Sequence, residues 1–254
     1  MSVLSANFNL ADYSLICSTL DEKIKLILHG RLIKYLVLDF VIGFYILFGL
    51  GSAEWLHEEF WNYTEILAKY LEFTMEWIVN NPAGLKLNEP INRTLSSFFG
   101  YHIYLWTTFI FFLRVDYFNR FFITGLCGGI SSLAALLYDF SIIFFIHFKC
   151  FDAYATKLWS LCYYTVTRLW GLVRGKKWNP LRERTDNVIL DTRQQFLSTS
   201  LFVILLFIIP TIFVYFIVFR ALRYMVSSIQ LILKTIAQWP MTAHDLEMTY
   251  IASK

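Results

Sequence analysis

Four ionisable side chains lie inside apolar stretches of this 254-residue chain, and their types suit acid–base chemistry. They are Asp39, His102, Asp139 and His147. Burying an ionisable group in a bilayer is costly, so such residues are candidates for proton transfer or for a polar path through the membrane. The same side chains also form hydrogen bonds between helices. We expect that structural role, for example from Asp to His, and keep a membrane-embedded lipid enzyme and a transporter as alternatives.

A cationic run, "RGKKWNPLRER" at 174–184, contains five Lys or Arg residues among eleven. Each cation near an anionic membrane surface is worth about 1 kcal/mol, and Trp anchors chains at the interface. Docking on phospholipid headgroups or on an acidic partner is the predicted role; the alternative is that the charges only keep the loop cytosolic. The predicted docking residues are Arg174, Lys176, Lys177, Trp178, Asn179, Arg182 and Arg184.

The local signals around this run predict a tight turn between two helices. Gly175 can cap the end of one helix. Asn179 followed by Pro180 is typical of the first positions of the next helix. The charged side chains would then be exposed together.

The motifs of common enzyme classes are missing from the sequence. It has no Walker loop, no GxSxG, no HExxH and no Cys/His cluster with zinc spacing. The four cysteines are scattered and form no CxxC. We therefore expect no metal, no cofactor and no catalytic residue. The net charge is only +3, which argues against nucleic acid as a partner.

The elements that must position these residues are helices in a membrane. The chain is 57% hydrophobic and 19% aromatic, with 16% charged residues and a mean hydropathy of +0.52, whereas a soluble domain carries about 25% charged residues. A spanning helix needs about 20 apolar residues. The sequence predicts an all-α, polytopic integral membrane protein with about four spans, at residues 35–53, 95–113, 121–148 and 196–219.

Amphipathic segments separate these spans. Polar residues repeat at helical spacing over about 57–79, 153–173 and 221–239, which predicts helices lying on the membrane or against other helices. Pro240 is expected to end the last one. The predicted organisation is a short N-terminal segment, 1–34, a single membrane domain, 35–239, and a tail, 240–254. If 153–173 also crosses the membrane, five spans result.

Several blocks resemble the PIG-Q family, the Q subunits of the phosphatidylinositol N-acetylglucosaminyltransferase complex. These blocks come in the family's order over about residues 30–235, and the RGKKWN block is highly specific. They are "NPAGLKLN" (81–88), "FGYHIYLW" (99–106), "FIHFKCFDAY" (145–154), "LWGLVRGKKWNPLRERTD" (169–186) and "LFVILLFIIPTIFVYFIVFRALR" (201–223). The first block adds Pro82, Gly84, Lys86 and Asn88 as a predicted loop motif.

The resemblance implies a multi-pass protein of the endoplasmic reticulum membrane. In that family's complex the A subunit, PIG-A, transfers GlcNAc from UDP-GlcNAc to phosphatidylinositol on the cytosolic face, in the first step of GPI-anchor biosynthesis. The Q subunit is implied to be non-catalytic and to assemble and stabilise PIG-A with PIG-C, PIG-H and PIG-P in the phospholipid membrane. Some members carry a long N-terminal region, where this chain has about 34 residues before the first predicted span.

Overall fold

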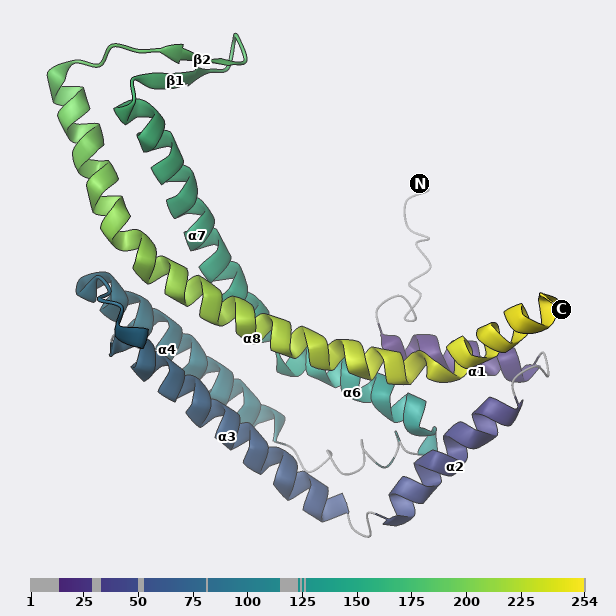
Figure 1. Ribbon diagram of the computed structural model, residues 1–254. Helices are drawn as coiled ribbons and strands as arrows, with labels where there is room; N and C mark the ends of the chain where they lie inside the picture. The colour runs from purple at the N-terminus through teal and green to yellow at the C-terminus, as the bar shows by residue number, and fades with distance from the viewer. Residues whose placement is uncertain are drawn as a thin grey trace, which may run out of the picture. The chain divides into compact units, whose positions relative to one another are not determined.

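The structure is a computed structural model that describes residues 14–28, 33–49, 53–80, 82–114, 123, 125 and 127–253. It is predominantly helical, which confirms the all-α class, with one small hairpin (Figure 1). In chain order the elements are α1 (Leu15–Leu28), α2 (Ile33–Gly49), α3 (Ala53–Val79), the 3-10 turn η2 (Pro82–Gly84), α4 (Glu89–Leu113), α6 (Ile130–Phe144), α7 (Ile146–Val173), β1 (Lys176–Asn179), β2 (Arg184–Asn187) and α8 (Thr192–Ala252).

The chain divides into two compact units, where the sequence predicts one membrane domain. The first unit combines the described residues up to Ile66 with those from Phe109 to Ile146 and from Met225 onward. The second unit contains Leu67–Thr108 and His147–Tyr224. Long helices such as α3 and α8 contribute residues to both units.

In the first unit, α1 and α2 pack against α6. The predicted N-terminal segment therefore includes a 14-residue helix that sequence reasoning missed. Small side chains at the start of α6 permit the close approach, since Ala135 is completely buried, as is Ala237 of α8. Leu15 and Ile16 of α1 pack against this cluster.

In the second unit, α7 and the first half of α8 lie side by side (Figure 1). Trp159 of α7 contacts the rings of Phe213 and Phe216 at 5.1 and 5.7 Å between centroids. Near the hairpin, Trp170 stacks on Phe202. These aromatic contacts fix how the two helices enter and leave the hairpin.

Helix α4 completes the core of this unit. Phe99 lies 4.1 Å from the ring of Phe219, and the buried Trp106 contacts Phe148 of α7 edge to face. The core is therefore built from aromatic side chains of three helices, two of which carry the hairpin.

The boundaries of the helices differ from the predicted ones at two places. Helix α8 continues from the predicted span at 196–219 through the segment 221–239 and past Pro240, so this proline does not end it. The predicted span at 121–148 is interrupted, because α6 ends at Phe144 and α7 starts at Ile146 and includes all of 153–173. Phe145 lies between them, and its N–H donates to the carbonyl of Ser141.

The described helices do not confirm four membrane spans. Among the described residues, one helix, the Thr192–Tyr250 stretch of α8, is long and apolar enough to cross a membrane. The pair α6 and α7 would be a second if it forms one span. The first predicted span corresponds to α2, which has 17 residues, at the lower end of the range of about 17–25 for a spanning helix.

Candidate functional site

The cationic run forms a β-hairpin, so the predicted turn between two helices is wrong. β1 and β2 pair antiparallel, with Lys176 opposite Asn187 and Asn179 opposite Arg184. The next helix, α8, begins only at Thr192. Asn179 and Pro180 are thus at the tip of a hairpin and do not start a helix.

The side chain of Asn179 explains the hairpin. Its Oδ1 accepts the N–H of Leu181 at 3.0 Å, which makes the chain turn directly after β1. Its Nδ2 donates to Oδ2 of Asp186 at 2.8 Å, across the hairpin. Glu183, with a φ of 47°, completes the tip in the left-handed region. As a helix cap, Asn179 would accept backbone N–H groups of the helix that follows it. Its bond to Asp186 on the opposite strand favours the hairpin over that helix.

Gly175 joins the hairpin to α7, as its predicted capping role requires. Its φ is 67°, a conformation that favours glycine, and its N–H donates to the carbonyl of Leu172 at 2.9 Å. Its own carbonyl accepts the N–H of Val188 at 2.8 Å. The chain therefore leaves α7 in a fixed direction and returns beside it.

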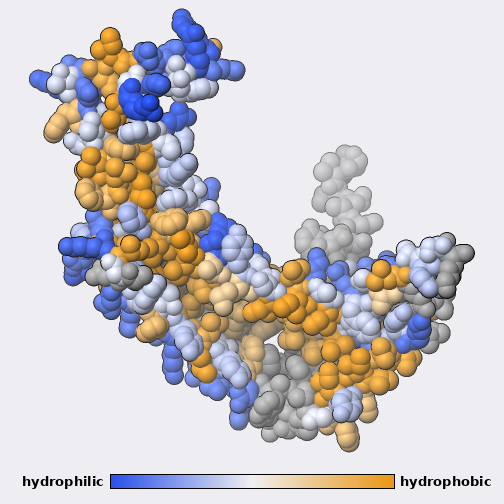
Figure 2. Space-filling view, viewed as in Figure 1, coloured by the Kyte–Doolittle hydropathy of each residue, from blue (hydrophilic) through white to orange (hydrophobic). Residues whose placement is uncertain are grey.

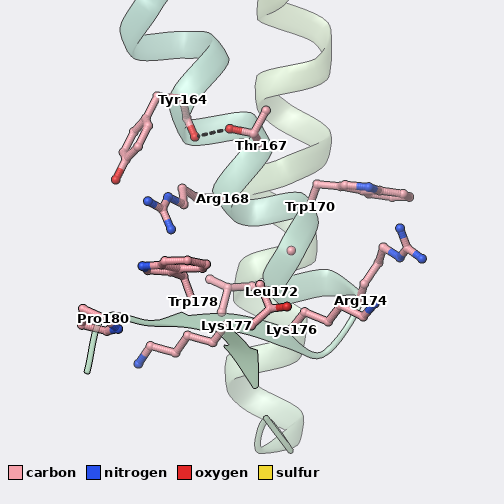
Figure 3. Close-up of a pocket in the computed structure, with 12 residues that line it drawn as sticks. Tyr164, Thr167, Arg168, Trp170, Leu172, Arg174, Lys176, Lys177, Trp178 and Pro180 are labelled. Atoms are coloured by element: carbon pink, nitrogen blue, oxygen red, sulfur yellow. Dashed lines mark hydrogen bonds between the residues drawn. The ribbon is translucent and has the colours of Figure 1, made fainter. Parts of the chain in front are cut away.

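A groove of about 590 Å³ lies between the C-terminal end of α7 and the hairpin, and we call it the hairpin groove (Figure 3). Four of its lining residues are cations and none is acidic. Its lining consists of Tyr164, Thr167, Arg168, Trp170, Gly171, Leu172, Arg174, Lys176, Lys177, Trp178, Pro180 and Thr185.

Aromatic rings hold the two guanidinium groups of the groove. The guanidinium carbon of Arg168 lies 5.0 Å from the centre of the Tyr164 ring, and that of Arg174 lies 5.7 Å from Trp170. Figure 3 shows Arg168 between the rings of Tyr164 and Trp178. A stacked guanidinium keeps the N–H groups at its edge available to an anion.

The structure divides the predicted docking residues into two groups. Arg174, Lys176, Lys177 and Trp178 line the hairpin groove. Asn179 and Arg184 instead bond to Asp186, with Arg184 Nε at 2.9 Å from Oδ1, and Arg182 is exposed outside the lining.

Sequence reasoning missed the wall of the groove that α7 provides. Its cationic and aromatic residues are Tyr164, Arg168 and Trp170. The signal was present, since Tyr164 and Arg168 are four residues apart in a polar stripe that leads into the cationic run.

The predicted loop motif connects α3 to α4. Gly84 has a φ of 76° in η2, and the N–H of Leu85 donates to the carbonyl of Pro82 at 3.0 Å. Asn88 caps α4, because its Oδ1 accepts the N–H of Ile91 at 3.3 Å. Its own N–H donates to Oγ1 of Thr211 in α8, and Lys86 lines a second pocket of about 360 Å³.

Asn92 of α4 is a buried junction between three helices. Its Nδ2 donates to the last carbonyls of α3, those of Ile78 and Val79, at 3.1 and 3.3 Å. Its Oδ1 accepts the hydroxyl of Tyr215 in α8 at 2.8 Å. All polar groups of the Asn92 amide that face the core are therefore paired.

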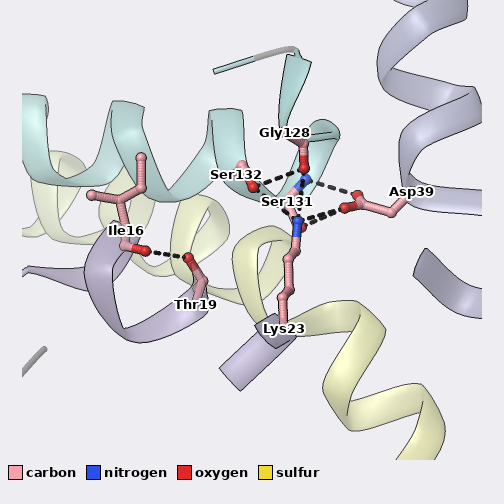
Figure 4. A network of polar contacts seen from close by, with 7 residues as sticks. All are labelled: Ile16, Thr19, Lys23, Asp39, Gly128, Ser131 and Ser132. Atoms are coloured by element: carbon pink, nitrogen blue, oxygen red, sulfur yellow. Dashed lines mark hydrogen bonds and ion pairs between the residues drawn. The ribbon is translucent and has the colours of Figure 1, made fainter. Parts of the chain in front are cut away.

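Asp39 belongs to a buried ionic cluster, which we call the Lys23 clamp (Figure 4). The ammonium of Lys23 in α1 donates to Asp39 of α2, to the carbonyl of Gly128 and to Oγ of Ser132, each at 2.8 Å. Asp39 also accepts the N–H and the hydroxyl of Ser131 at 2.9 and 2.7 Å. Lys23 and Asp39 are 5% and 0% exposed, so the pair is desolvated and fully hydrogen-bonded.

Asp139 of α6 binds the start of α1. Its carboxylate accepts the hydroxyl of Ser14 at 2.6 Å and the N–H groups of Leu15 and Ile16 at 3.0 and 3.1 Å. This is an N-cap provided by another helix, and the negative charge favours the N-terminal end of α1. Within the described residues, Asp39 accepts from donors of α1 and α6, and Asp139 accepts from donors at the start of α1, whereas the sequence predicted histidine partners.

The two histidines belong to the second unit. His102 bonds through Nδ1 to the carbonyl of Phe98 at 2.8 Å, and its ring lies 5.5 Å from that of Tyr154. His147 is in the first turn of α7. Among the described residues, no group of three or more His, Cys, Asp or Glu is placed to hold a metal ion.

Comparison with known protein families decides the identity. The model of the Gpi1 family, described as the N-acetylglucosaminyl transferase component, matches residues 5–248. The chain belongs to the Gpi1 family. This is the family of the Q subunits that the sequence motifs resemble.

This chain is similar to Gpi1 family members from animals and fungi. It is 38% identical over 166 residues to the phosphatidylinositol N-acetylglucosaminyltransferase subunit Q of Homo sapiens, covering 65% of this chain and 22% of the relative. It is 31% identical over 179 residues to the N-acetylglucosaminyl-phosphatidylinositol biosynthetic protein gpi1 of Schizosaccharomyces pombe, covering 67% and 26%. The match thus spans about a quarter of each relative. No solved structure matches this Gpi1 family chain.

Proposed function

We propose that this chain is a non-catalytic subunit that assembles and stabilises the complex transferring GlcNAc from UDP-GlcNAc to phosphatidylinositol. Two facts support this proposal. The chain belongs to the Gpi1 family, and its human relative is named as subunit Q of that transferase. The reaction is the first step of GPI-anchor biosynthesis.

The observation that carries the proposal is the use of two carboxylates, of which Asp39 is buried and Asp139 half-buried. Asp39 and Asp139 join α1 to α2 and to α6 through ammonium, hydroxyl and backbone donors. A general acid or base needs a proton that it can exchange with a substrate, and a transport path needs polar groups that face water. Carboxylates occupied in this way favour a structural role over a lipid enzyme or a transporter.

The proposed setting is the endoplasmic reticulum membrane, with the chain crossing it about four times. In this arrangement the spans are about 35–53, 95–113, 121–148 and 196–219, and α6 with the start of α7 forms the third. The hairpin faces the cytosol, because cationic loops remain there. The proposed partners are the catalytic PIG-A and the membrane subunits PIG-C, PIG-H and PIG-P.

Purification from native membranes tests the assembly role. We expect the tagged chain to require detergent and to bring the catalytic subunit and other membrane subunits with it, identified by mass spectrometry. A matched control uses an unrelated tagged protein of the same membrane. Recovery of the chain alone, stable and monodisperse, would contradict the proposed function.

Glycosylation of Asn62 tests the four-span topology. The chain has two sequons, and Asn62 on α3 is exposed whereas Asn92 is 3% exposed and hydrogen-bonded. With four spans and a cytosolic hairpin, the segment containing Asn62 is also cytosolic and stays unmodified. An endoglycosidase-sensitive mass shift that disappears in Asn62→Gln would instead require five spans. A sequon inserted after Lys234, luminal in the four-span arrangement, is the positive control.

A further inference from the structure

We propose that the hairpin groove binds the phosphate-bearing headgroup of an anionic phospholipid. The argument rests on the charge, the size and the surroundings of the groove. It does not depend on the proposed assembly role, because a structural subunit and an enzyme would both benefit from a lipid held at this place.

The groove is positively charged and its cations are available to a ligand. Arg168, Arg174, Lys176 and Lys177 line it, and no lining residue is acidic. In the part of the chain that the structure describes, none of the four forms an ion pair, in contrast to Arg184, which is bonded to Asp186. Several Lys and Arg donors converging without a carboxylate are the arrangement that binds phosphate oxygens through charge-assisted hydrogen bonds.

The dimensions and lining of the groove fit a headgroup. Its volume of about 590 Å³ lies in the range of about 300–1,000 Å³ that is typical of small-molecule sites. Tyr164, Trp170 and Trp178 provide flat apolar walls beside the cations. Tyr and Trp combine an apolar ring with a polar group, which suits them to the headgroup level of a bilayer.

The surroundings identify a lipid, and not a free anion, as the source of the phosphate. At the tip of the hairpin Leu181 is 95% exposed, and Ile189 after β2 is 101% exposed. A free anion in the groove would leave these aliphatic side chains in water. Insertion into the boundary between headgroups and acyl chains would remove their apolar surface from water, which is favourable. Seven residues after Ile189, the apolar part of α8 starts at Phe196, which is 75% exposed.

The hairpin groove therefore lies next to the end of the membrane-crossing segment. Figure 2 shows hydrophilic side chains around the hairpin and a hydrophobic band on the adjoining part of α7 and α8. This change from apolar to cationic surface is what a helix presents where it leaves the hydrocarbon core. A headgroup in the groove would keep its acyl chains beside the apolar turns of α8.

Equilibrium binding to the purified full chain in a nonionic detergent tests this proposal. The probes are dioctanoyl phosphatidylserine, dioctanoyl phosphatidylcholine, inorganic phosphate and an oligoglutamate peptide. We expect the chain to bind the phosphatidylserine more tightly than each of the other three. Tighter binding of inorganic phosphate would identify a free-anion site, and tighter binding of oligoglutamate would identify an acidic protein segment; either result overturns the proposal.

Two double variants with the same loss of charge locate the binding. Each cation at an anionic lipid surface contributes a factor of about five in affinity, so Arg168→Gln with Lys177→Gln should weaken phosphatidylserine binding about thirtyfold. Lys157→Gln with Arg193→Gln removes two exposed cations outside the lining and should leave the affinity unchanged. Equal weakening in both would show general charge attraction and contradict a specific groove.

A third variant guards against a folding defect. Lys176 and Lys177 are exposed on β1, so Lys176→Gln with Lys177→Gln should keep the helical circular dichroism and thermal midpoint of the unchanged chain. It is expected to show a loss of phosphatidylserine affinity similar to that of the first variant. If this variant folds correctly and binds phosphatidylserine as tightly as the unchanged chain, the groove is not the binding site.

Discussion

Replacing Asp39 by Ala is expected to lower the free energy of unfolding of the chain by about 3–5 kcal/mol, because it leaves the charge of Lys23 buried without a partner. Lys23 is 5% exposed, and its other two partners, the carbonyl of Gly128 and the hydroxyl of Ser132, carry no charge. For a chain of this size the thermal midpoint should fall by about 10 °C. Thermal unfolding of the full chain in detergent measures the change.

Two further variants show whether the lost ion pair is the cause. Asp39→Leu combined with Lys23→Met removes both charges, and a buried pair replaced together by apolar groups often costs little. The double variant should therefore be more stable than either single change. Lys25→Ala removes the cation of the exposed Lys25–Asp21 pair and should give no measurable change, since surface pairs contribute little. If Asp39→Ala unfolds like the unchanged chain, the Lys23 clamp does not stabilise the first unit.

Gly129→Ala tests the same cluster through the backbone. Gly129 precedes α6 with a φ of 93°, a conformation that other residues rarely adopt. A Cβ at this position would overlap the carboxylate of Asp39. Destabilisation comparable to that of Asp39→Ala would therefore support the clamp geometry.

Asn92→Ala is expected to destabilise the second unit by about 3 kcal/mol, because several buried groups lose their partners at once. The two carbonyls at the end of α3 lose the amide donor, and the hydroxyl of Tyr215 loses its Oδ1 acceptor. Tyr215→Phe removes only the hydroxyl and should cost about 1 kcal/mol. The combined variant should be less destabilised than the sum, since both changes remove one shared contact.

Thr94→Ala is the matched control for Asn92. It destroys the same sequon, but Thr94 is exposed and only bonds to the carbonyl of Pro90 within its own helix. Thermal unfolding should therefore be unchanged. A loss of stability in Thr94→Ala as large as that in Asn92→Ala would show that the sequon matters through a glycan and would contradict the structural role of the amide.

How much the sequence predicts depends on how local the signal is. The helical spacing of polar residues over 57–79 predicted a helix, and α3 covers this segment, because that periodicity is a property of one helix alone. Pro240 misled the prediction, because α8 continues past it to Ala252. Helix α1 was missed because its polar residues pair with distant ones, Lys23 with Asp39 and Ser14 with Asp139.

The candidate site was predicted in composition but not in shape. The cationic residues of 174–184 were identified, because charge density is visible in sequence. The hairpin was not predicted, because it depends on a hydrogen bond between Asn179 and Asp186, which lie on opposite strands. Arg168 was visible in the polar stripe of α7, but its place in the lining depends on the hairpin, which packs beside the end of that helix.

The transferase activity of the assembled complex, measured per complex recovered, tests the central claim most directly. The variants are Asp139→Asn, His102→Gln and His147→Gln, each compared with the unchanged chain in membranes that contain the partner subunits. A non-catalytic assembly subunit predicts that the amount of complex falls with the stability of the variant while turnover per complex stays constant. A complex recovered in full amount with its turnover abolished would show that this chain takes part in the chemistry.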